Sequence, residues 1–220
     1  MRSDLYPKAF KLVIPCHNCR DYIAQCLASI RDQTFADWTA VVADDASDDG
    51  TVDRIKPFLK DSRFSLRSAP KRLHLMGNTL SALRSLDIRP NHVAAIVDGD
   101  DYLLPEALEK LWERHRQGFD LVYTDEEIQG NNHSVGRAPL QRIPVRRQLW
   151  CFSMLRSFKG YLFNLLDDQT FKDEKGNYFR AAGDLSLFLP MAELAGMGKI
   201  KFIDEKLYYY RVHDRCNFKV

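Results

Sequence analysis

The chain has 220 residues, of which 45% are hydrophobic and 28% charged, and 32 Lys and Arg residues nearly balance 30 Asp and Glu residues. The hydrophobic fraction excludes a disordered chain, and the length suits one domain with a sizeable core. The net charge of +2 excludes a uniformly basic binder of nucleic acid. No apolar run reaches the roughly 18 residues of a membrane-spanning helix, and residues 1–10 lack the apolar core of a secretion signal, so we expect a cytoplasmic protein.

The five cysteines indicate a reducing compartment, because their number is odd and their density is low. Cys16 and Cys19 have the spacing of half a zinc site, but no second pair follows to complete the roughly four ligands of structural zinc. We therefore expect the cysteines to be small buried thiols.

Short apolar runs rich in β-branched residues recur along the chain, and each ends at a proline or a polar residue. Continuous runs of this kind predict strands that are buried on both faces. Helical patterns separate them, and the first places Tyr22, Cys26 and Ile30 on one face. This alternation predicts an α/β fold with a mainly parallel central sheet flanked by helices on both faces. We expect strands at residues 11–14, 39–43, 92–97 and 119–123, and helices at 22–30, 51–59 and 105–116.

Residues 128–166 differ from the rest, because they contain six Arg or Lys residues and no Asp or Glu. We expect a long loop over 129–148 and a basic, aromatic helix over 149–166. This segment would cover the sheet, form a mobile lid on the acceptor side, or touch an anionic membrane surface through residues 142–163. Beyond it we expect a helix at 181–195, kinked or broken by Pro190, and closing strands at 200–203 and 207–212.

Polar side chains follow three of the predicted strands. They are His17 and Asn18, then Asp44 and Asp45, then Asp98-Gly99-Asp100-Asp101. The carboxyl ends of parallel strands meet at one edge of a sheet, where ligands bind. Because clustered carboxylates repel one another, this edge predicts a divalent cation, Mn²⁺ or Mg²⁺, that holds a diphosphate. Asp and Gly are also ordinary turn formers after strands, which is the alternative for the Asp44 cluster.

Four segments in order resemble a known family. They are residues 13–18 (Val-Ile-Pro-Cys-His-Asn), 42–51 (Val-Ala-Asp-Asp-Ala-Ser-Asp-Asp-Gly-Thr), 78–88, and 96–105 with its Asp-Gly-Asp-Asp. The chain is similar in them to glycosyltransferase family 2, whose fold is the nucleotide-diphospho-sugar transferase fold called GT-A. The resemblance implies a single domain over residues 1–220, with a nucleotide-binding half at 1–104 and an acceptor-side half at 105–220.

The resemblance implies that Pro15, His17 and Asn18 line the nucleotide pocket. Asp45, or Asp44 beside it, would accept a hydrogen bond from the base. A uracil N–H suits a carboxylate acceptor, so the expected donor is a UDP-sugar.

By the same resemblance, Asp98 and Gly99 would contact the ribose or the metal-bound diphosphate, and Asp100 would ligate Mn²⁺ or Mg²⁺. His213, in a Tyr-Arg-Val-His ending typical of the family, would be a further metal ligand or a diphosphate contact. A lone histidine is also compatible with a simple packing role. Arg84, on the helix before the metal-binding strand, would contact the nucleotide.

The third segment departs from the family pattern around that arginine. Leu80 replaces a glycine, and Ser85 and Asp87 replace the usual Asn and Gly. These departures concern the role of Arg84 more than the fold.

Asp184, at the start of the predicted helix 181–195, matches the position of the general base of the family, although Gly183 replaces a common Glu. An Asp at a helix N-terminus also caps free N–H groups, which is the structural alternative. With the upstream segments in place, we expect Asp184 to be catalytic.

Together these features predict a metal-dependent, inverting glycosyltransferase, a hexosyltransferase acting on an acceptor hydroxyl of a glycan, a lipid-linked glycan or a protein. One alternative is a sugar nucleotidyltransferase, which would need a Gly-rich basic loop where this chain has residues 15–19. The other is a catalytically silent nucleotide- or glycan-binding module, against which the intact Asp98, Asp100 and Asp184 argue.

Overall fold

The computed structural model describes residues 10–131, 133–180 and 183–214. The strands are β1 (Phe10–Cys16), β2 (Trp38–Asp44), β3 (Phe64–Ser68), β4 (Val93–Ile96), β5 (Tyr102–Leu103), β6 (Leu121–Ile128), β7 (Arg156–Lys159) and β8 (Ile200–Tyr210). The α-helices are α1 (Ile23–Arg31), α2 (Thr51–Ile55), α3 (His74–Ser85), α4 (Ala107–Arg116), α5 (Gly160–Asn164) and α6 (Gly183–Ala195). Short 3₁₀ segments cover Lys56–Lys60, Val145–Arg147, Asp168–Phe171 and Met197–Lys199.

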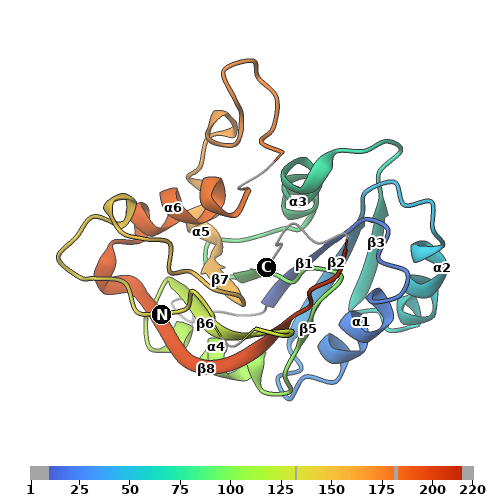
Figure 1. The fold of residues 1–220 in the computed structure, drawn as a ribbon, viewed down its shortest axis with the longest axis horizontal. Coiled ribbons are helices and arrows are strands. Elements are labelled where there is room, and N and C mark those ends of the chain that lie inside the picture. The colour runs from blue at the N-terminus through green and yellow to red at the C-terminus, as the bar shows by residue number, and fades with distance from the viewer. Residues whose placement is uncertain (1–9, 132, 181–182, 215–220) are drawn as a thin grey trace.

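Within the described residues the strands form one eight-stranded sheet in the order β3-β2-β1-β4-β7-β6-β8-β5 (Figure 1). Strands β3, β2, β1 and β4 run parallel to one another, as expected. The register pairs Cys16 with Asp44 and Val13 with Ile96, so the loops that follow these strands leave from one edge. The predicted α/β class is confirmed, and that edge is where the polar side chains were expected.

The second part of the sheet mixes strand directions. β7 pairs antiparallel with both β4 and β6, whereas β8 runs parallel to β6 and β5 antiparallel to β8. β7 therefore joins the N-terminal half of the sheet to the C-terminal half. Its first residue, Arg156, pairs with Ile96 of β4 and with Tyr123 of β6.

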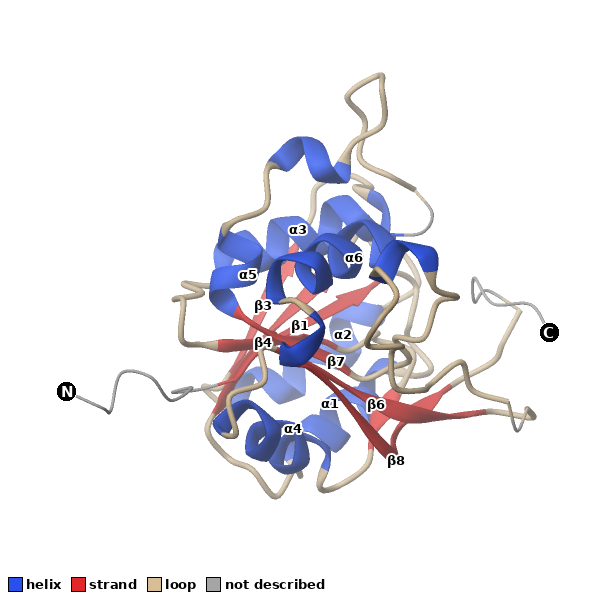
Figure 2. Cartoon of the chain, turned by 90° about the vertical axis from the view of Figure 1, so that its left-hand side faces the viewer, coloured by secondary structure: helices blue, strands red, loops and turns tan. Residues whose placement is uncertain are grey.

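Helices cover both faces of the sheet and create two cores, with α3, α5 and α6 on one face and α1, α2 and α4 on the other (Figure 2). The helical residues of the first core include Ile23, Leu27, Ile30, Ile55, Leu108 and Leu111. Those of the second include Met76, Leu80, Leu83, Leu162, Phe188 and Met191. A sheet buried on both faces explains why its central strands are continuously apolar rather than alternating.

The predicted helix over residues 149–166 is wrong. Residues 149–155 are extended or bent, β7 follows, and only α5 is helical. Phe152 and Phe158 are 1% and 0% exposed, and both lie in the second core. Because β7 lies inside a sheet that helices cover on both faces, its side chains on either face meet other elements, and the aromatic pattern reflects a buried strand instead of an amphipathic helix.

Other expectations met smaller corrections. β3 and β5 were not predicted, and residues 200–210 form one strand rather than two. Pro190 does not break α6, which runs from Gly183 to Ala195 with the proline inside it. The four described cysteines are buried free thiols, as expected, whereas Cys216, residues 1–9 and residues 181–182 lie outside the described part of the chain. Over the described ranges, no helix has the length and apolarity that crossing a bilayer requires.

Candidate functional site

The loops after β1 and β2 are tied together by side chains at their tips. Asn18 donates from Nδ2 to Asp48 Oδ1 at 3.0 Å and accepts at Oδ1 from the Asp48 N–H at 3.1 Å. The Asn18 N–H also donates to Ser47 Oγ at 2.9 Å, and His17 Nδ1 lies 2.9 Å from the Asp45 carbonyl oxygen. These bonds make one polar wall of residues that are far apart in sequence, and Asn18 serves to build that wall.

Asp45 is a buried carboxylate with a defined set of partners. It is 2% exposed, accepts the Leu73 N–H at 2.6 Å and lies 3.3 Å from Arg72 Nε. Its neighbour Asp44 is equally buried, and its Oδ1 has no hydrogen-bond partner among the described residues. Of the two candidates for base recognition, Asp45 is the one that lines a cavity.

The turn after β4 places three carboxylates close together. The Asp98 N–H donates to Tyr208 Oη at 3.2 Å, and the Tyr208 hydroxyl donates to Asp101 at 2.7 Å. Gly99 permits this turn, because a Cβ there would lie 2.7 Å from Cys16 Cβ. The Gly99 N–H also donates to the Pro15 carbonyl at 3.0 Å, which fastens the turn to the end of β1. Asp101 thus helps to hold the turn through Tyr208, and Asp98, Asp100 and Asp101 all line one cavity.

Burial and mutual repulsion act on these carboxylates. Burial, followed by the charge of Asp100, raises the pKa of Asp98 to about 7. The pKa of Asp101 is also raised well above its ordinary value, mainly by burial. A cation bound beside Asp98 and Asp100 would relieve this repulsion, since an opposite charge nearby favours the ionised form.

His213 completes the edge. Its Nε2 lies 3.0 Å from Asp100 Oδ2, and its ring stacks on Tyr22 at 4.7 Å. Arg211 holds this ending in place, because its Nε donates to the Asp100 carbonyl at 2.8 Å. Carboxylate and imidazole suit Mn²⁺, and carboxylate suits Mg²⁺. The described residues contain no group of three or more His, Cys, Asp or Glu side chains that could hold a metal, so a cation here would need oxygens from the substrate and water.

The cysteines near this edge of the sheet are small buried thiols, as predicted. Cys16, Cys19 and Cys26 lie beneath the carboxylate turn, and burial raises the pKa of all three thiols, that of Cys19 to about 12. Protonated, buried thiols do not act as metal ligands or nucleophiles. They are packing residues.

Two adjoining cavities open beside the strand ends. The smaller, about 210 Å³, is lined mainly by polar residues, among them Pro15, His17, Asp45, Arg72, Asn78 and Asp100. The larger, about 440 Å³, has walls from α3, β7 and α6, with Met76, Met154, Arg156, Asp184, Leu187 and Phe188 among its residues. Leu75, Asp98 and Tyr210 line both cavities. We call them the polar cavity and the apolar-walled cavity.

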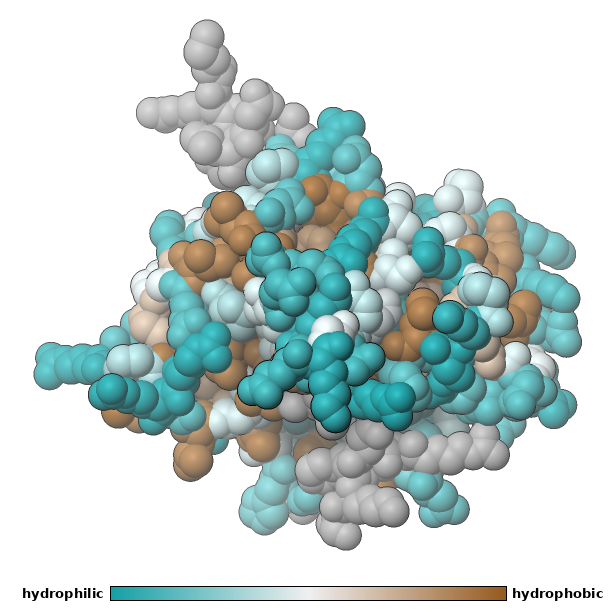
Figure 3. Space-filling model, turned by 90° about the horizontal axis from the view of Figure 1, so that it is seen from above, coloured by the Kyte–Doolittle hydropathy of each residue, from teal (hydrophilic) through white to brown (hydrophobic). Residues whose placement is uncertain are grey.

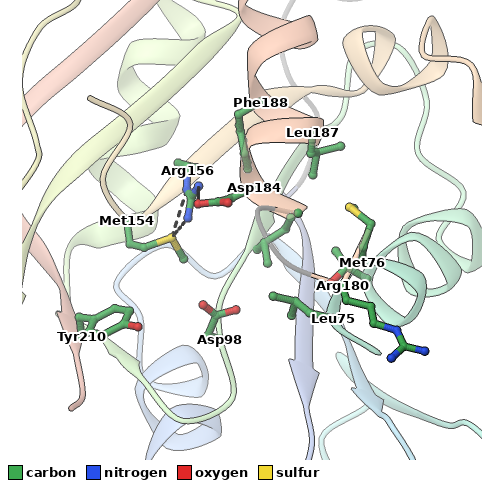
Figure 4. A pocket seen from close by; sticks show the side chains of 13 residues that line it. Leu75, Met76, Asp98, Met154, Arg156, Arg180, Asp184, Leu187, Phe188 and Tyr210 are labelled. Carbon is green, nitrogen blue, oxygen red and sulfur yellow. Dashed lines mark hydrogen bonds and ion pairs between the residues drawn. The ribbon is translucent and has the colours of Figure 1, made fainter. Parts of the chain in front are cut away.

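Asp184 lies in the first turn of α6 and opens onto the apolar-walled cavity (Figure 4). Its Oδ1 accepts the Leu185 N–H at 3.0 Å, and its Oδ2 lies 3.1 Å from Arg156 Nη1. Figure 4 shows Arg156 between Asp184 and Met154, with Asp98 in the same cavity. The geometry includes a hydrogen bond to helix backbone, as the structural alternative expected, but also brings the carboxylate into the cavity that Asp98 lines.

Arg84 is not part of this arrangement. It pairs with Asp168 and donates to Tyr178 Oη at 3.1 Å, and it lines a separate cavity that neither Asp98 nor Asp45 reaches. The reason is its position on the side of α3 that faces the Asp168–Phe171 segment. The cations that do line the two main cavities are Arg72, Arg156 and Arg180.

Sequence reasoning missed these arginines as site residues. Arg72 lies in a loop without a motif and is recognised only by its pairing with Asp45. Arg156 belongs to a segment that resembled a lid or a helix, and its inward position follows from the strand β7. The available signal in the sequence was a single arginine inside the run Phe152-Ser-Met-Leu-Arg156-Ser-Phe158, which is otherwise uncharged.

Solved structures of glycosyltransferases have the same fold. The S. aureus protein TarS, residues 1–349 in complex with UDP, superimposes with a TM-score of 0.73 at 19% identity, over 93% of this chain and 60% of that chain. Glucosyl-3-phosphoglycerate synthase from Mycobacterium tuberculosis, in complex with Mn²⁺, UDP and glucosyl-3-phosphoglycerate, gives a TM-score of 0.63 at 16% identity, over 94% and 73% of the two chains. The GT-A fold is thereby confirmed.

Sequence comparison identifies the family. Residues 11–171 match Glycosyl transferase family 2, and the chain belongs to that family. A curated relative in Escherichia coli, UDP-Glc:alpha-D-GlcNAc-diphosphoundecaprenol beta-1,3-glucosyltransferase WfgD, is 28% identical over 127 residues, 57% of this chain and 49% of its own. TuaG of Bacillus subtilis, a putative teichuronic acid biosynthesis glycosyltransferase, is 28% identical over 105 residues, 45% and 38% of the two chains. The matches thus span less than half of the length of these relatives.

Proposed function

We propose that this chain is an inverting glycosyltransferase that transfers a sugar from a UDP-sugar to an acceptor hydroxyl. The observation that carries the proposal is that Asp98 and Asp184, from opposite halves of the chain, line one cavity, and that Asp98 also lines the polar cavity. A donor in the polar cavity would present its anomeric carbon beside Asp98, where the two cavities meet, and Asp184 would face it from the other cavity. Membership of the family and the UDP-bound TarS structure support this reading.

The polar cavity is the proposed nucleotide site. Asp45 is positioned by Arg72 and by the Leu73 N–H, and it offers a fixed carboxylate to a donor group of the base. A carboxylate accepts from the N–H of uracil, which is why UDP is the proposed nucleotide. His17 lies beside Asp45, at the mouth of the loop that Asn18 holds.

Asp100 and His213 are the proposed protein ligands of a divalent cation. Their contact at 3.0 Å and the repulsion among the neighbouring carboxylates support a cationic partner at this point. Mn²⁺ or Mg²⁺, when bound, supplies positive charge that stabilises the leaving diphosphate. The Mn²⁺-containing mycobacterial structure is consistent with such use in this fold.

Asp184 is the proposed general base. It removes the proton from the acceptor hydroxyl as that oxygen attacks the anomeric carbon, and the nucleotide leaves from the opposite side. Binding donor and acceptor together in adjoining cavities makes the encounter a proximity-assisted step. On this proposal residues 105–220 supply the acceptor side and residues 1–104 the donor side of one domain.

The acceptor is proposed to be a glycan carried on a lipid, as the name of WfgD states for that relative. The predicted membrane contact through residues 142–163 needs correction, because Phe152 and Phe158 are core residues. The exposed part is the stretch 140–149, in which Leu140 and Leu149 are 59% and 83% exposed and Arg142, Arg146 and Arg147 are exposed as well. Exposed apolar side chains among arginines suit an anionic membrane surface.

One face of the molecule can be followed in Figure 3. Figure 3 shows the face seen from above in the orientation of Figure 1, where hydrophobic side chains lie in small groups between hydrophilic ones. A contact with anionic vesicles is checked by co-sedimentation at low and high salt. The variant Arg142→Glu/Arg146→Glu/Arg147→Glu is expected to lose binding, and Arg54→Glu/Lys56→Glu/Lys60→Glu, with the same charge change at other exposed residues, is expected to keep it.

The direct test of the function is a panel of nucleotide sugars incubated with the protein and Mn²⁺, with free nucleotide as the readout. UDP release from a UDP-sugar, stimulated by an acceptor glycan, supports the proposal. Release of pyrophosphate from UTP and a sugar phosphate would instead identify a nucleotidyltransferase. UDP binding without turnover in the presence of any acceptor would identify the silent binding module.

A further inference from the structure

Arg156 is a buried cation at the centre of the apolar-walled cavity. Its side chain is 10% exposed, and its backbone in β7 pairs with Ile96, two residues before Asp98. A guanidinium is expensive to bury without a partner, so its contacts indicate what it is there to do. The nearest carboxylate is that of Asp184, with Oδ2 at 3.1 Å from Nη1.

The guanidinium is held from several sides. It lies over the ring of Phe188 at 4.8 Å and over that of Trp150 at 5.7 Å. Its Nε also contacts the sulfur of Met154 at 3.1 Å. Cation–π contacts of this kind hold the guanidinium in place and so fix the position of its charge. The position of the Arg156 guanidinium is therefore set by these neighbours. The carboxylate that pairs with it has to adopt the orientation that this position requires.

Asp184 has the opposite character. Its side chain is 40% exposed, and its backbone lies in the first turn of a helix. One carboxylate oxygen meets the adjacent Leu185 N–H, and the other meets Arg156. Without Arg156, one of these two fixed points is lost, and the carboxylate is free to rotate about its terminal bond.

We propose that Arg156 is a positioning residue for the transfer reaction: its ion pair with Asp184 orients the carboxylate so that the remaining lone pairs face the acceptor hydroxyl. The inference rests on the proposed role of Asp184 as base. A misoriented base slows proton transfer while leaving donor binding intact, because the polar cavity does not contain Arg156.

The test is a double-mutant cycle with Arg156→Gln and Asp184→Asn, read as kcat and as KM for the UDP-sugar that the donor panel identifies. Arg156→Gln is expected to lower kcat about 100-fold and to change the donor KM less than about threefold. In the Asp184→Asn background, the same substitution is expected to lower kcat less than about threefold, because its partner is already gone. Arg156→Lys keeps the charge without the planar fork and should fall in between.

A matched control is Lys159→Gln. Lys159 lies on the same strand and pairs with Asp120 at 2.8 Å, with side chains 16% and 12% exposed, but it lines neither cavity. The substitution Lys159→Gln removes a similarly buried ion pair, and we expect it to lower the melting temperature without changing kcat. The kcat loss of Arg156→Gln would then be specific to the cavity.

Several results would overturn the inference. These are an unchanged kcat in Arg156→Gln, a raised donor KM with unchanged kcat, and losses that multiply in the double variant. If Asp184→Asn is too slow to measure, the split between kcat and KM in Arg156→Gln decides. If Arg156→Gln does not fold, Arg156→Lys decides by the same split. An inactive wild-type protein would count against the proposed function, whereas an active one with multiplying losses would count against Arg156 alone.

Discussion

The two cavities of this protein are built in opposite ways. The polar cavity takes most of its lining from the ends of β1, β2 and β4 and the loops that directly follow them, and hydrogen bonds join the first two of those loops. The apolar-walled cavity gathers residues from α3, β7 and α6, three separate segments of the chain, and Met76 of α3 is 108 positions from Asp184 of α6. Most residues of the proposed donor site therefore lie just after three neighbouring strands. The proposed base, Asp184, reaches its position only when α6 packs against the rest of the fold.

The same difference explains what the sequence predicted. The parallel strands, the carboxylate clusters and the position of Asp184 followed from short apolar runs and ordered motifs, since each depends on a few neighbouring residues. The strand β7 did not follow, because a buried strand and a buried helix have similar composition when aromatic residues fill both sides. Arg156 and Arg72 were missed because their roles depend on partners that are distant in the sequence. Asp184 is 28 positions from Arg156, and Asp45 is 27 positions from Arg72.

Arg84 shows the limit of a motif without geometry. Its place in the chain matched a family position, yet its side chain pairs with Asp168 in another cavity. Helix α3 presents one face to the nucleotide side, through Asn78, and another to the Asp168–Phe171 segment. The face on which a residue lies depends on the rotation of the helix about its axis. The spacing of apolar residues in the sequence predicts that rotation only approximately.

The largest effect is expected from a variant that lacks one of the two proposed cation ligands. Asp100→Ala removes the carboxylate that contacts His213. We expect transfer to fall by at least about 10³-fold, because the leaving diphosphate loses its charge stabilisation. Calorimetric titration with UDP should show Mn²⁺-independent binding only. An unchanged Mn²⁺ dependence of UDP binding would show that the cation is held elsewhere.

A smaller effect is expected from the base-recognition carboxylate. Asp45→Ala removes the acceptor for the Leu73 N–H and the partner of Arg72. The Kd for UDP should rise about tenfold, which corresponds to about 1.4 kcal/mol, with kcat at saturating donor little changed. Asp53→Ala, which breaks an exposed pair with Lys56, serves as the control and should bind UDP normally. Equal affinity in both variants would remove Asp45 from the nucleotide site.

The close packing of the carboxylate turn can be tested through stability. Gly99→Ala places a Cβ 2.7 Å from Cys16 Cβ and 3.1 Å from the Pro15 carbonyl oxygen. Overpacking of this kind should lower the free energy of unfolding in urea by about 1–3 kcal/mol and weaken UDP binding. Gly198→Ala, where an added Cβ meets nothing within 4 Å, should leave both unchanged. A fully stable Gly99→Ala would mean that the turn relaxes readily.

A pH effect is expected away from both cavities. Burial lowers the pKa of His115 from 6.5 to about 3, and its Nδ1 lies 3.0 Å from the Phe119 carbonyl oxygen. The unfolded chain therefore takes up a proton below pH 6.5 that the folded chain does not, so stability is lost as pH falls from 6.5 toward 3. Relative to His115→Gln, the wild type should lose about 1.4 kcal/mol per pH unit between pH 6 and 4. Parallel pH curves in urea unfolding would contradict this.

The central claim is that donor binding and proton removal occur in two different cavities of one site. Asp184→Asn tests it most directly, with the Kd for UDP and the kcat for the identified UDP-sugar measured on the same preparation. We expect kcat to fall about 10²–10⁴-fold while the Kd changes less than about threefold, since Asp184 does not line the polar cavity. Transfer at the wild-type rate, or loss of UDP binding together with activity, would contradict the account.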